Sequence, residues 1–198
     1  SDLTKPEPMN RLLTGDVGFG KTEVALRASF RVALNGRQVV LVAPTTILVD
    51  QHHGLFRERM EQFGVKVARM TRLESAADVK KCLDGLAKGS VDIAIGTHKL
   101  IGKGVTLKNP GLLIIDEEQK FGVGSKDKLK LIKQNVDTLT LTATPIPRTL
   151  QFSLMGARDL SVIATPPPNR HPVETELHNF NEELVRDAMR FEISRGGQ

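Results

Sequence analysis

The chain has 198 residues, of which 39% are hydrophobic and 26% are charged, and its net charge is +5 at pH 7. This composition suits a globular domain with a packed core, and no apolar run approaches the roughly 20 residues of a membrane helix, so we expect no membrane partner. The absence of Trp and Tyr argues against base stacking as the main binding mode. The positive charge favours a polyanionic partner, although a merely basic surface explains it equally well.

Short apolar runs alternate with helix-patterned segments over residues 1–165. We predict strands at residues 11–14, 38–43, 66–70, 92–96, 112–116, 139–142 and 160–163. Several are continuous Val, Ile and Leu, as in strands buried on both faces of a parallel sheet. Capping signals predict helices at residues 22–34, from Thr45 or Thr46 to Phe63, and from Ser75 to near Gly89. The alternation predicts an α/β fold, with a mainly parallel central sheet and helices on both faces.

The pattern changes after residue 165, where three prolines follow one another. Proline cannot continue a helix or a central strand, which indicates a linker. Beyond it we predict a strand-like run at Val173–Phe180 and a helix capped by Asn181. One strand and one helix cannot bury a core. We therefore predict a first domain at residues 1–165, and at residues 166–198 a proline-rich linker with the truncated start of a second domain.

A glycine-rich segment follows the first predicted strand and opens a helix. Residues 15–22 match the pattern G-x-x-x-x-G-K-[ST] in full. Glycines let successive backbone N–H groups turn toward an anion, and the helix adds the positive end of its dipole. Lys21 is expected to reach the β- and γ-phosphates, and the Thr22 hydroxyl to bind Mg²⁺, whereas the alternative is a glycine-rich surface turn. The rest of the predicted phosphate cradle is Gly15, Asp16, Val17, Gly18, Phe19 and Gly20.

Two acids, Asp116 and Glu117, end the predicted strand at residues 112–116. Ligands of an open parallel sheet bind at the carboxyl ends of its strands, so this pair is expected beside the glycine-rich loop. Asp116 is then expected to hold Mg²⁺, and Glu117 to orient and deprotonate the attacking water. Together with Lys21 they form the predicted catalytic set. Taken alone, two acids after a strand are also consistent with a solvated helix start.

Hydroxyl and basic residues follow three more of the predicted strands. Thr142 ends the strand at 139–142 and Thr144 follows it, where they can hydrogen-bond Glu117 and respond to the γ-phosphate. Hydroxyls, amides and a lysine after two further strands can grip a phosphodiester backbone without reading sequence. Each group is also explained by an ordinary helix cap. The residues in question are Thr45 and Thr46 after the strand at 38–43, and Thr97, His98 and Lys99 after the strand at 92–96.

Taken in order, these segments resemble the first motor domain of superfamily 2 helicases and translocases, and among them the bacterial transcription-repair coupling factors. The resemblance covers nearly the whole chain and rests on residues 15–25, 43–52, 95–100, 116–123, 141–150 and 158–167. RecG-type branch-migration helicases share residues 142–150 but usually carry Ser in place of Phe19, and they are the nearest alternative. Two further hypotheses are a non-motor P-loop enzyme, such as a small-molecule kinase, and a binding module with a vestigial nucleotide site.

The resemblance implies a RecA-like P-loop domain that moves on double-stranded DNA, together with a second such domain, by hydrolysing ATP with Mg²⁺. In that family the motor displaces stalled RNA polymerase and recruits excision-repair proteins in the cytoplasm; the single cysteine, Cys82, also favours that reducing compartment. The arginine finger belongs to the second domain, so we expect this chain alone to be nearly inactive as an ATPase. By position, Gln119, Thr142 and Thr144 couple hydrolysis to movement, and the family touches the DNA backbone at Thr45, Thr46, Thr97, His98 and Lys99. Glu74 lies in a stretch that is usually more basic in the family.

Overall fold

The computed structural model describes residues 2–102, 104–122, 124, 129, 135–143, 158–168 and 176–197. The chain divides into two compact units, Ser1–Pro167 and Pro168–Gln198. The first unit contains the sheet and the helices that cover it. The second contains helix α6 (Glu182–Ser194).

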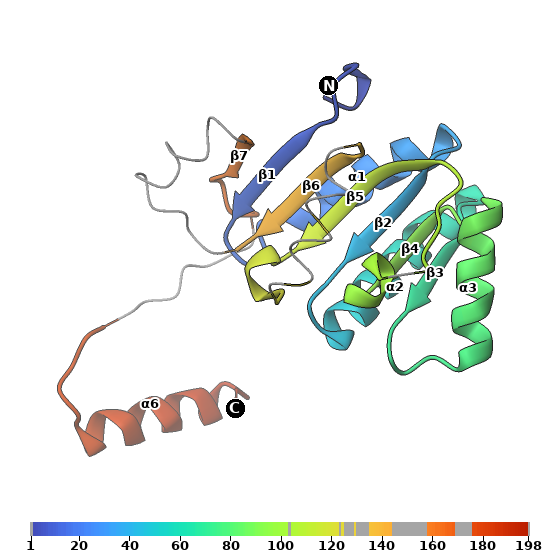
Figure 1. The fold of residues 1–198 in the computed structure, drawn as a ribbon. Helices are drawn as coiled ribbons and strands as arrows, with labels where there is room; N and C mark the ends of the chain where they lie inside the picture. The colour runs from blue at the N-terminus through green and yellow to red at the C-terminus, as the bar shows by residue number, and fades with distance from the viewer. Residues whose placement is uncertain are drawn as a thin grey trace. The chain divides into compact units, whose positions relative to one another are not determined.

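Seven parallel strands form one sheet in the order β3-β4-β2-β5-β6-β1-β7 (Figure 1). Every residue of β2 and β4 is buried, as their continuous apolar runs predict. Because all the strands are parallel, their carboxyl ends meet at one edge of the sheet. The strands are β1 (Asn10–Gly15), β2 (Gln38–Val42), β3 (Val67–Met70), β4 (Ile93–Gly96), β5 (Pro110–Asp116), β6 (Asp137–Thr142) and β7 (Asp159–Ile163).

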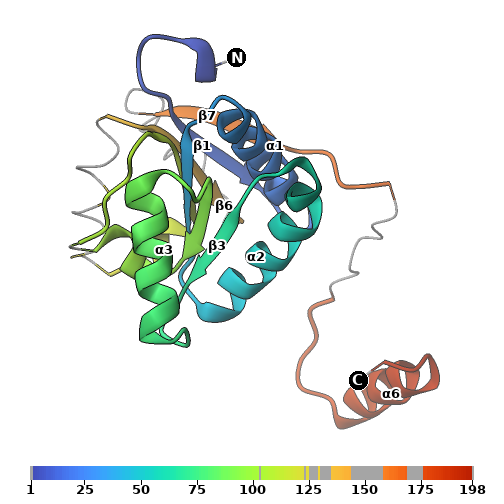
Figure 2. The same ribbon diagram turned by 90° about the vertical axis from the view of Figure 1, so that its right-hand side faces the viewer.

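Helices cover both faces of the sheet, as predicted (Figure 2). Helices α1 (Lys21–Leu34) and α2 (Thr46–Met60) pack on one face, where Phe56 and Met60 are fully buried. Helix α3 (Ala76–Lys88) packs on the opposite face through Cys82 and Leu86. Burial raises the pKa of the Cys82 thiol, as expected of an inert core cysteine. The short 3₁₀ helices are η1 (Asp2–Thr4), η2 (Glu61–Phe63), η3 (His98–Ile101) and η4 (Glu118–Lys120).

The predicted caps begin α2 and α3. The Thr45 hydroxyl accepts a hydrogen bond from the amide of Leu48 at the start of α2, and Ser75 does the same for Asp78 in α3. The α2 prediction needs one correction, because the α-helix ends at Met60 and residues 61–63 form η2. Gly64 follows at φ 77°, and the tighter last turn leads into this left-handed residue.

The second unit confirms one of its two predicted elements. Asn181 caps α6 by accepting hydrogen bonds from the amides of Glu183 and Leu184. The predicted strand-like run is Val173–Phe180, and its described part, residues 176–180, forms no strand. A strand needs a neighbour to pair its backbone groups, and the described residues of this unit offer none. None of the helices in the described ranges is long and apolar enough to span a membrane.

Candidate nucleotide-binding site

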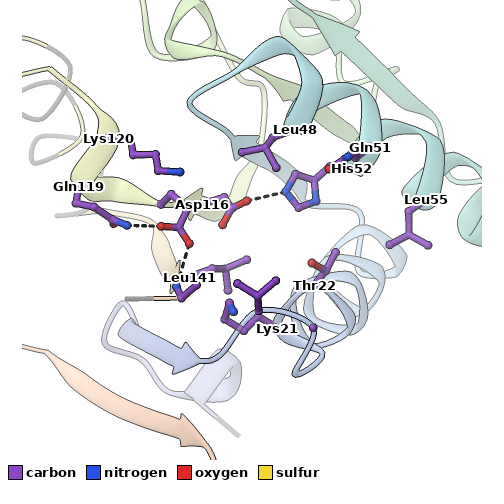
Figure 3. Close-up of a pocket in the computed structure, with 14 residues that line it drawn as sticks. Lys21, Thr22, Leu48, Gln51, His52, Leu55, Asp116, Gln119, Lys120 and Leu141 are labelled. Carbon is purple, nitrogen blue, oxygen red and sulfur yellow. Dashed lines mark hydrogen bonds and ion pairs between the residues drawn. The ribbon is translucent and has the colours of Figure 1, made fainter. Parts of the chain in front are cut away.

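A pocket of about 800 Å³ lies at the carboxyl edge of the sheet, where β1, β5 and β6 end (Figure 3). The glycine-rich loop and α1 form its floor, while α2 and the segments after β5 and β6 form its walls. It therefore brings together Lys21 and Asp116, which the sequence places about 100 residues apart. The lining residues are Val17, Gly18, Lys21, Thr22, Leu48, Gln51, His52, Leu55, Asp116, Glu117, Gln119, Lys120, Leu141 and Ala143.

The glycine-rich loop has the backbone that its sequence predicts. Gly18 and Gly20 have φ angles of 80° and 83°, which side-chain-bearing residues rarely adopt. Gly20 is also the N-cap residue of α1 and provides no side chain to cap it. The first backbone N–H groups of α1 therefore lack a side-chain cap, which is the arrangement that binds a phosphate.

The Lys21 ammonium lies inside this loop. Its Nζ atom donates hydrogen bonds to the backbone carbonyls of Gly15, at 2.6 Å, and Asp16, at 2.9 Å. An ammonium has three N–H donors, so the two carbonyls leave one donor for a phosphate oxygen. Thr22 follows in the next position of α1 and lines the same pocket. The loop thus concentrates one positive charge and a set of backbone donors in a small volume.

Asp116 ends β5 and is 8% exposed. One of its carboxylate oxygens, Oδ2, lies 2.9 Å from Nε2 of His52 in α2. The sequence does not predict this contact. His52 belongs to one of the segments that resemble the family, residues 43–52, but the sequence indicates no role for its side chain. Leu48, His52 and Leu55 follow one another at spacings of four and three residues, which places them on one helix face. All three side chains line the pocket, so this spacing is the sequence signal that indicates which face of α2 contributes to the site.

Glu117 is the one non-glycine residue with positive φ (52°) among the described residues. Such a conformation costs roughly 1–2 kcal/mol and concentrates at functional sites. Its Oε1 atom accepts a hydrogen bond of 2.9 Å from the amide of Ala143, and its Oε2 atom accepts one from the Gln119 side chain. Its own amide donates to the carbonyl of Leu141 at 3.0 Å. Glu117 therefore connects the ends of β5 and β6.

The predicted coupling residues have different places around Glu117. Gln119 lines the pocket and contacts Glu117 directly. Thr142 is buried at the end of β6, in register with Thr14 of β1. Thr144 lies outside the described residues. Between the two threonines, the backbone amide of Ala143 provides the described contact to Glu117.

The five predicted DNA-contacting residues lie at the same sheet edge, but beyond the nucleotide pocket. Thr45 and Thr46 follow β2, and Thr45 caps α2. Thr97 follows β4 and is buried, and its amide donates to the carbonyl of Met70 at 3.3 Å. His98 and Lys99 are exposed at the start of η3.

Glu74 has a local structural role in the loop between β3 and α3. Its carboxylate accepts hydrogen bonds from the Thr71 hydroxyl, at 2.5 Å, and from the Thr71 amide, and it pairs with Arg69 at 2.6 Å. Burial raises the pKa of Glu74, but these partners outweigh it and hold the pKa below its ordinary value. An acid in this stretch therefore stabilises the loop and neutralises Arg69.

Comparison with known proteins identifies the family. The family described as DEAD/DEAH box helicase matches residues 3–152. The chain belongs to the DEAD/DEAH box helicase family. Membership of this helicase family implies that ATP is used. The predicted RecA-like α/β fold is confirmed, because the family and its solved relatives share this parallel sheet.

Relatives of this helicase domain include transcription-repair coupling factors. Those of Bacillus subtilis (strain 168) and Staphylococcus aureus (strain USA300) are 53% and 52% identical over 197 residues. These matches cover 100% of this chain and 17% of the relatives' length.

Solved structures show the same sheet. RecG bound to a three-way DNA junction superposes with a TM-score of 0.82 at 38% identity, covering 100% of this chain and 26% of RecG. A DEAD box protein from Methanococcus jannaschii gives a TM-score of 0.61 at 21% identity, covering 78% of this chain and 44% of that protein, and it shows the fold alone.

Proposed function

We propose that this chain is the first RecA-like ATP-binding motor domain of a double-stranded DNA translocase that acts in transcription-coupled repair. The observation that carries the proposal is identity of 52–53% to transcription-repair coupling factors over the whole chain. The pocket that joins the glycine-rich loop to Asp116 and Glu117 supports the ATP-binding part. Displacement of stalled RNA polymerase and recruitment of excision-repair proteins would use regions outside this chain. The cytoplasm is the proposed location.

The pocket suits a magnesium–nucleotide complex. Thr22 and Asp116 offer a hydroxyl and a carboxylate oxygen, which are the hard donors that Mg²⁺ prefers. Among the described residues, no group of three His, Cys, Asp or Glu could hold a metal by itself. This fits an ion that takes its remaining ligands from phosphates and water. Bound there, the ion would supply neutralisation of the β- and γ-phosphate charge.

In the proposed reaction, Lys21 binds the β- and γ-phosphate oxygens through the donor that the loop carbonyls leave over. Glu117 orients a water molecule in line with the γ-phosphorus and accepts its proton as the water oxygen bonds to that phosphorus. The bond from the γ-phosphorus to the β,γ-bridging oxygen breaks, and ADP leaves with that oxygen. The Ala143 amide and Gln119 hold the Glu117 carboxylate from the segments after β6 and β5. A change at the γ-phosphate would therefore reach both segments, which is the coupling proposed for Gln119, Thr142 and Thr144.

DNA is proposed to bind the same sheet edge over β2 and β4, where Thr45, Thr46, Thr97, His98 and Lys99 follow the strands. An arginine finger from a second RecA-like domain is proposed to complete the site, and such a finger contributes about 10³–10⁵ in rate. Residues 1–198 tested in isolation are therefore expected to hydrolyse ATP very slowly. A RecG-type branch-migration motor is the second candidate. Its support is the TM-score of 0.82 at 38% identity to RecG.

A chimera separates these functions. We would replace the matching 197-residue segment of the Bacillus subtilis coupling factor with this chain, and carry Lys21→Ala in a control chimera. The proposal expects duplex DNA to stimulate ATP hydrolysis and the chimera to displace a stalled RNA polymerase. A chimera that folds and hydrolyses ATP but leaves the polymerase in place would contradict the coupling function. Strong DNA-stimulated turnover by the isolated chain would contradict the need for a second domain.

A further inference from the structure

His52 is a polar side chain of the pocket that the chemistry above does not use. It lies in the second turn of α2 and is 6% exposed. Figure 3 shows its ring directed at the carboxylate of Asp116, with 2.9 Å between Nε2 and Oδ2. A buried polar ring that hydrogen-bonds a carboxylate in a ligand pocket does more than fill space in the core, because it can also orient that carboxylate.

The direction of this hydrogen bond is set by the carboxylate. An ionised carboxylate only accepts hydrogen bonds, so Nε2 carries the proton and donates it to Oδ2. Phe56, one turn further along α2, packs edge-on against the ring, with centroids 6.5 Å apart and an angle of 88° between the planes. The ring plane is therefore fixed by packing before any ligand binds.

The contact also sets which oxygen of Asp116 remains available. The backbone of β5 is held between β2 and β6, so rotation of the side chain is the remaining freedom of Asp116. His52 takes Oδ2, whereas Oδ1 has no hydrogen-bond partner among the described residues. One oxygen is thus anchored and the second is left for a cation in the pocket.

We propose that His52 is a positioning residue, which holds Oδ2 of Asp116 so that Oδ1 is directed at the magnesium ion of the bound nucleotide. The inference rests on the proposed function, because it requires the pocket to take a magnesium–nucleotide complex. Hydrogen bonds to metal-binding carboxylates fix their orientation, and losing one typically costs 10–100-fold in metal affinity or activity. Magnesium dependence of nucleotide binding is therefore the property that His52 controls.

The test measures binding of adenosine 5′-(β,γ-imido)triphosphate by calorimetry, in excess MgCl₂ and in excess EDTA. In His52→Leu, the ratio of the two affinities should fall roughly tenfold or more, while the affinity in EDTA stays at the wild-type value. His52→Gln should restore most of the ratio, because its amide N–H reaches a similar position to Nε2. His53→Gln is the matched control, since His53 is the adjacent half-buried histidine and lies outside the pocket.

His52→Asn is a second test of the proposal, in case His52→Leu does not fold. It carries the same amide as glutamine on a shorter side chain, so it should show the loss that His52→Gln does not. An equal loss in MgCl₂ and EDTA, or a wild-type ratio in both His52→Leu and His52→Asn, would overturn the positioning role alone. Failure of the wild-type chain to bind the nucleotide in either condition would overturn the proposed function as well.

Discussion

The carboxyl edge of the sheet has two halves that carry polar side chains of different kinds. In the nucleotide half, over β1, β5 and β6, Lys21 donates to carbonyls of its own loop, whereas Asp116 and Glu117 contact distant segments. Glu117 also adopts a left-handed backbone. In the outer half, over β2 and β4, Thr45 caps a helix, and Thr97 sits in the turn into η3. In both halves the polar residues lie at or directly after the ends of strands, so their sequence patterns are similar.

The difference shows in which half the structural features are explained by a ligand and in which half the fold alone explains them. The sheet could form with ordinary turns at its strand ends, so it does not require a glutamate with a left-handed backbone or a lysine inside a glycine-rich loop. Thr45, by contrast, is fully explained by the start of α2. Nucleotide binding therefore has this geometry in its support, whereas the outer half has no comparable feature; both nucleotide binding and DNA binding by these residues stay predictions. Substitutions matched across the two halves separate these cases.

The largest effect is expected at Glu117. In the chimera, Glu117→Gln should lower DNA-stimulated ATP turnover by about 10²–10⁴-fold, because the amide cannot accept the proton of the attacking water. Binding of Mg·ATP should remain close to that of the parent chimera. Steady-state ATPase kinetics measure the first quantity, and equilibrium titration measures the second. Glu118→Gln is the control, since Glu118 pairs with Arg158 at 2.9 Å and lies outside the pocket lining; an equal loss there would contradict the role of Glu117.

Lys99 tests the outer half directly. Lys99→Ala should weaken duplex DNA binding by the chimera several-fold and reduce the slope of log affinity against log salt by about 1, as for one lost phosphate contact. Fluorescence anisotropy across a salt series measures both. Lys88→Ala removes the same charge at the end of α3, at the opposite edge of the sheet, and should leave the slope unchanged. Identical slopes for the two variants would mean that the outer half does not bind the backbone.

Thr45 is expected to act on stability rather than on the nucleotide. Thr45→Ala removes the acceptor for the Leu48 amide and should lower the free energy of unfolding by about 1 kcal/mol. Urea unfolding measures this loss, and nucleotide affinity should not change. Thr46→Ala, at the first residue of α2, should cost less than half as much. A stable Thr45→Ala protein that has lost DNA affinity would instead favour a direct contact.

The smallest effect concerns Glu74 and depends on pH. Its pKa is depressed in the folded state, so the ionised carboxylate stabilises the fold above its ordinary pKa of 4.5. That contribution is lost as pH falls from 4.5 through the lower folded-state pKa. Glu74→Gln should therefore be less stable than wild type at pH 7, by on the order of 1 kcal/mol, and the gap should narrow below pH 4.5. A gap that stays constant down to pH 3.5 in urea unfolding would contradict the depressed pKa.

Features that depend on neighbouring residues are predictable from the sequence. The apolar runs of β2 and β4 indicate their burial, and Ser75 and Asn181 lie where a cap precedes a helix. The glycine loop is equally readable, because Gly18 and Gly20 supply a backbone that side-chain-bearing residues avoid.

Features that depend on tertiary contacts are not predictable in this way. His52 and Asp116 are 64 positions apart. Only the tertiary fold, which packs α2 against β3 and β4, brings His52 to the end of β5. The left-handed backbone of Glu117 is set by its bonds to Leu141 and Ala143, not by its residue type. The strand expected in the run ending at Phe180 is wrong in its described part, because a strand-like run of residues does not by itself provide a partner strand.

The central claim is that the Lys21 side chain binds a phosphate of the nucleotide and does not stabilise the fold. Calorimetric titration of the chain and of Lys21→Ala with Mg·ADP, together with their melting temperatures, tests it most directly. Lys21 bonds only to loop carbonyls among the described residues, so the melting temperatures should agree within about 2 °C. The affinity of Lys21→Ala should be lower by roughly 100-fold, or too weak to detect. An unchanged affinity would contradict the assignment of the loop.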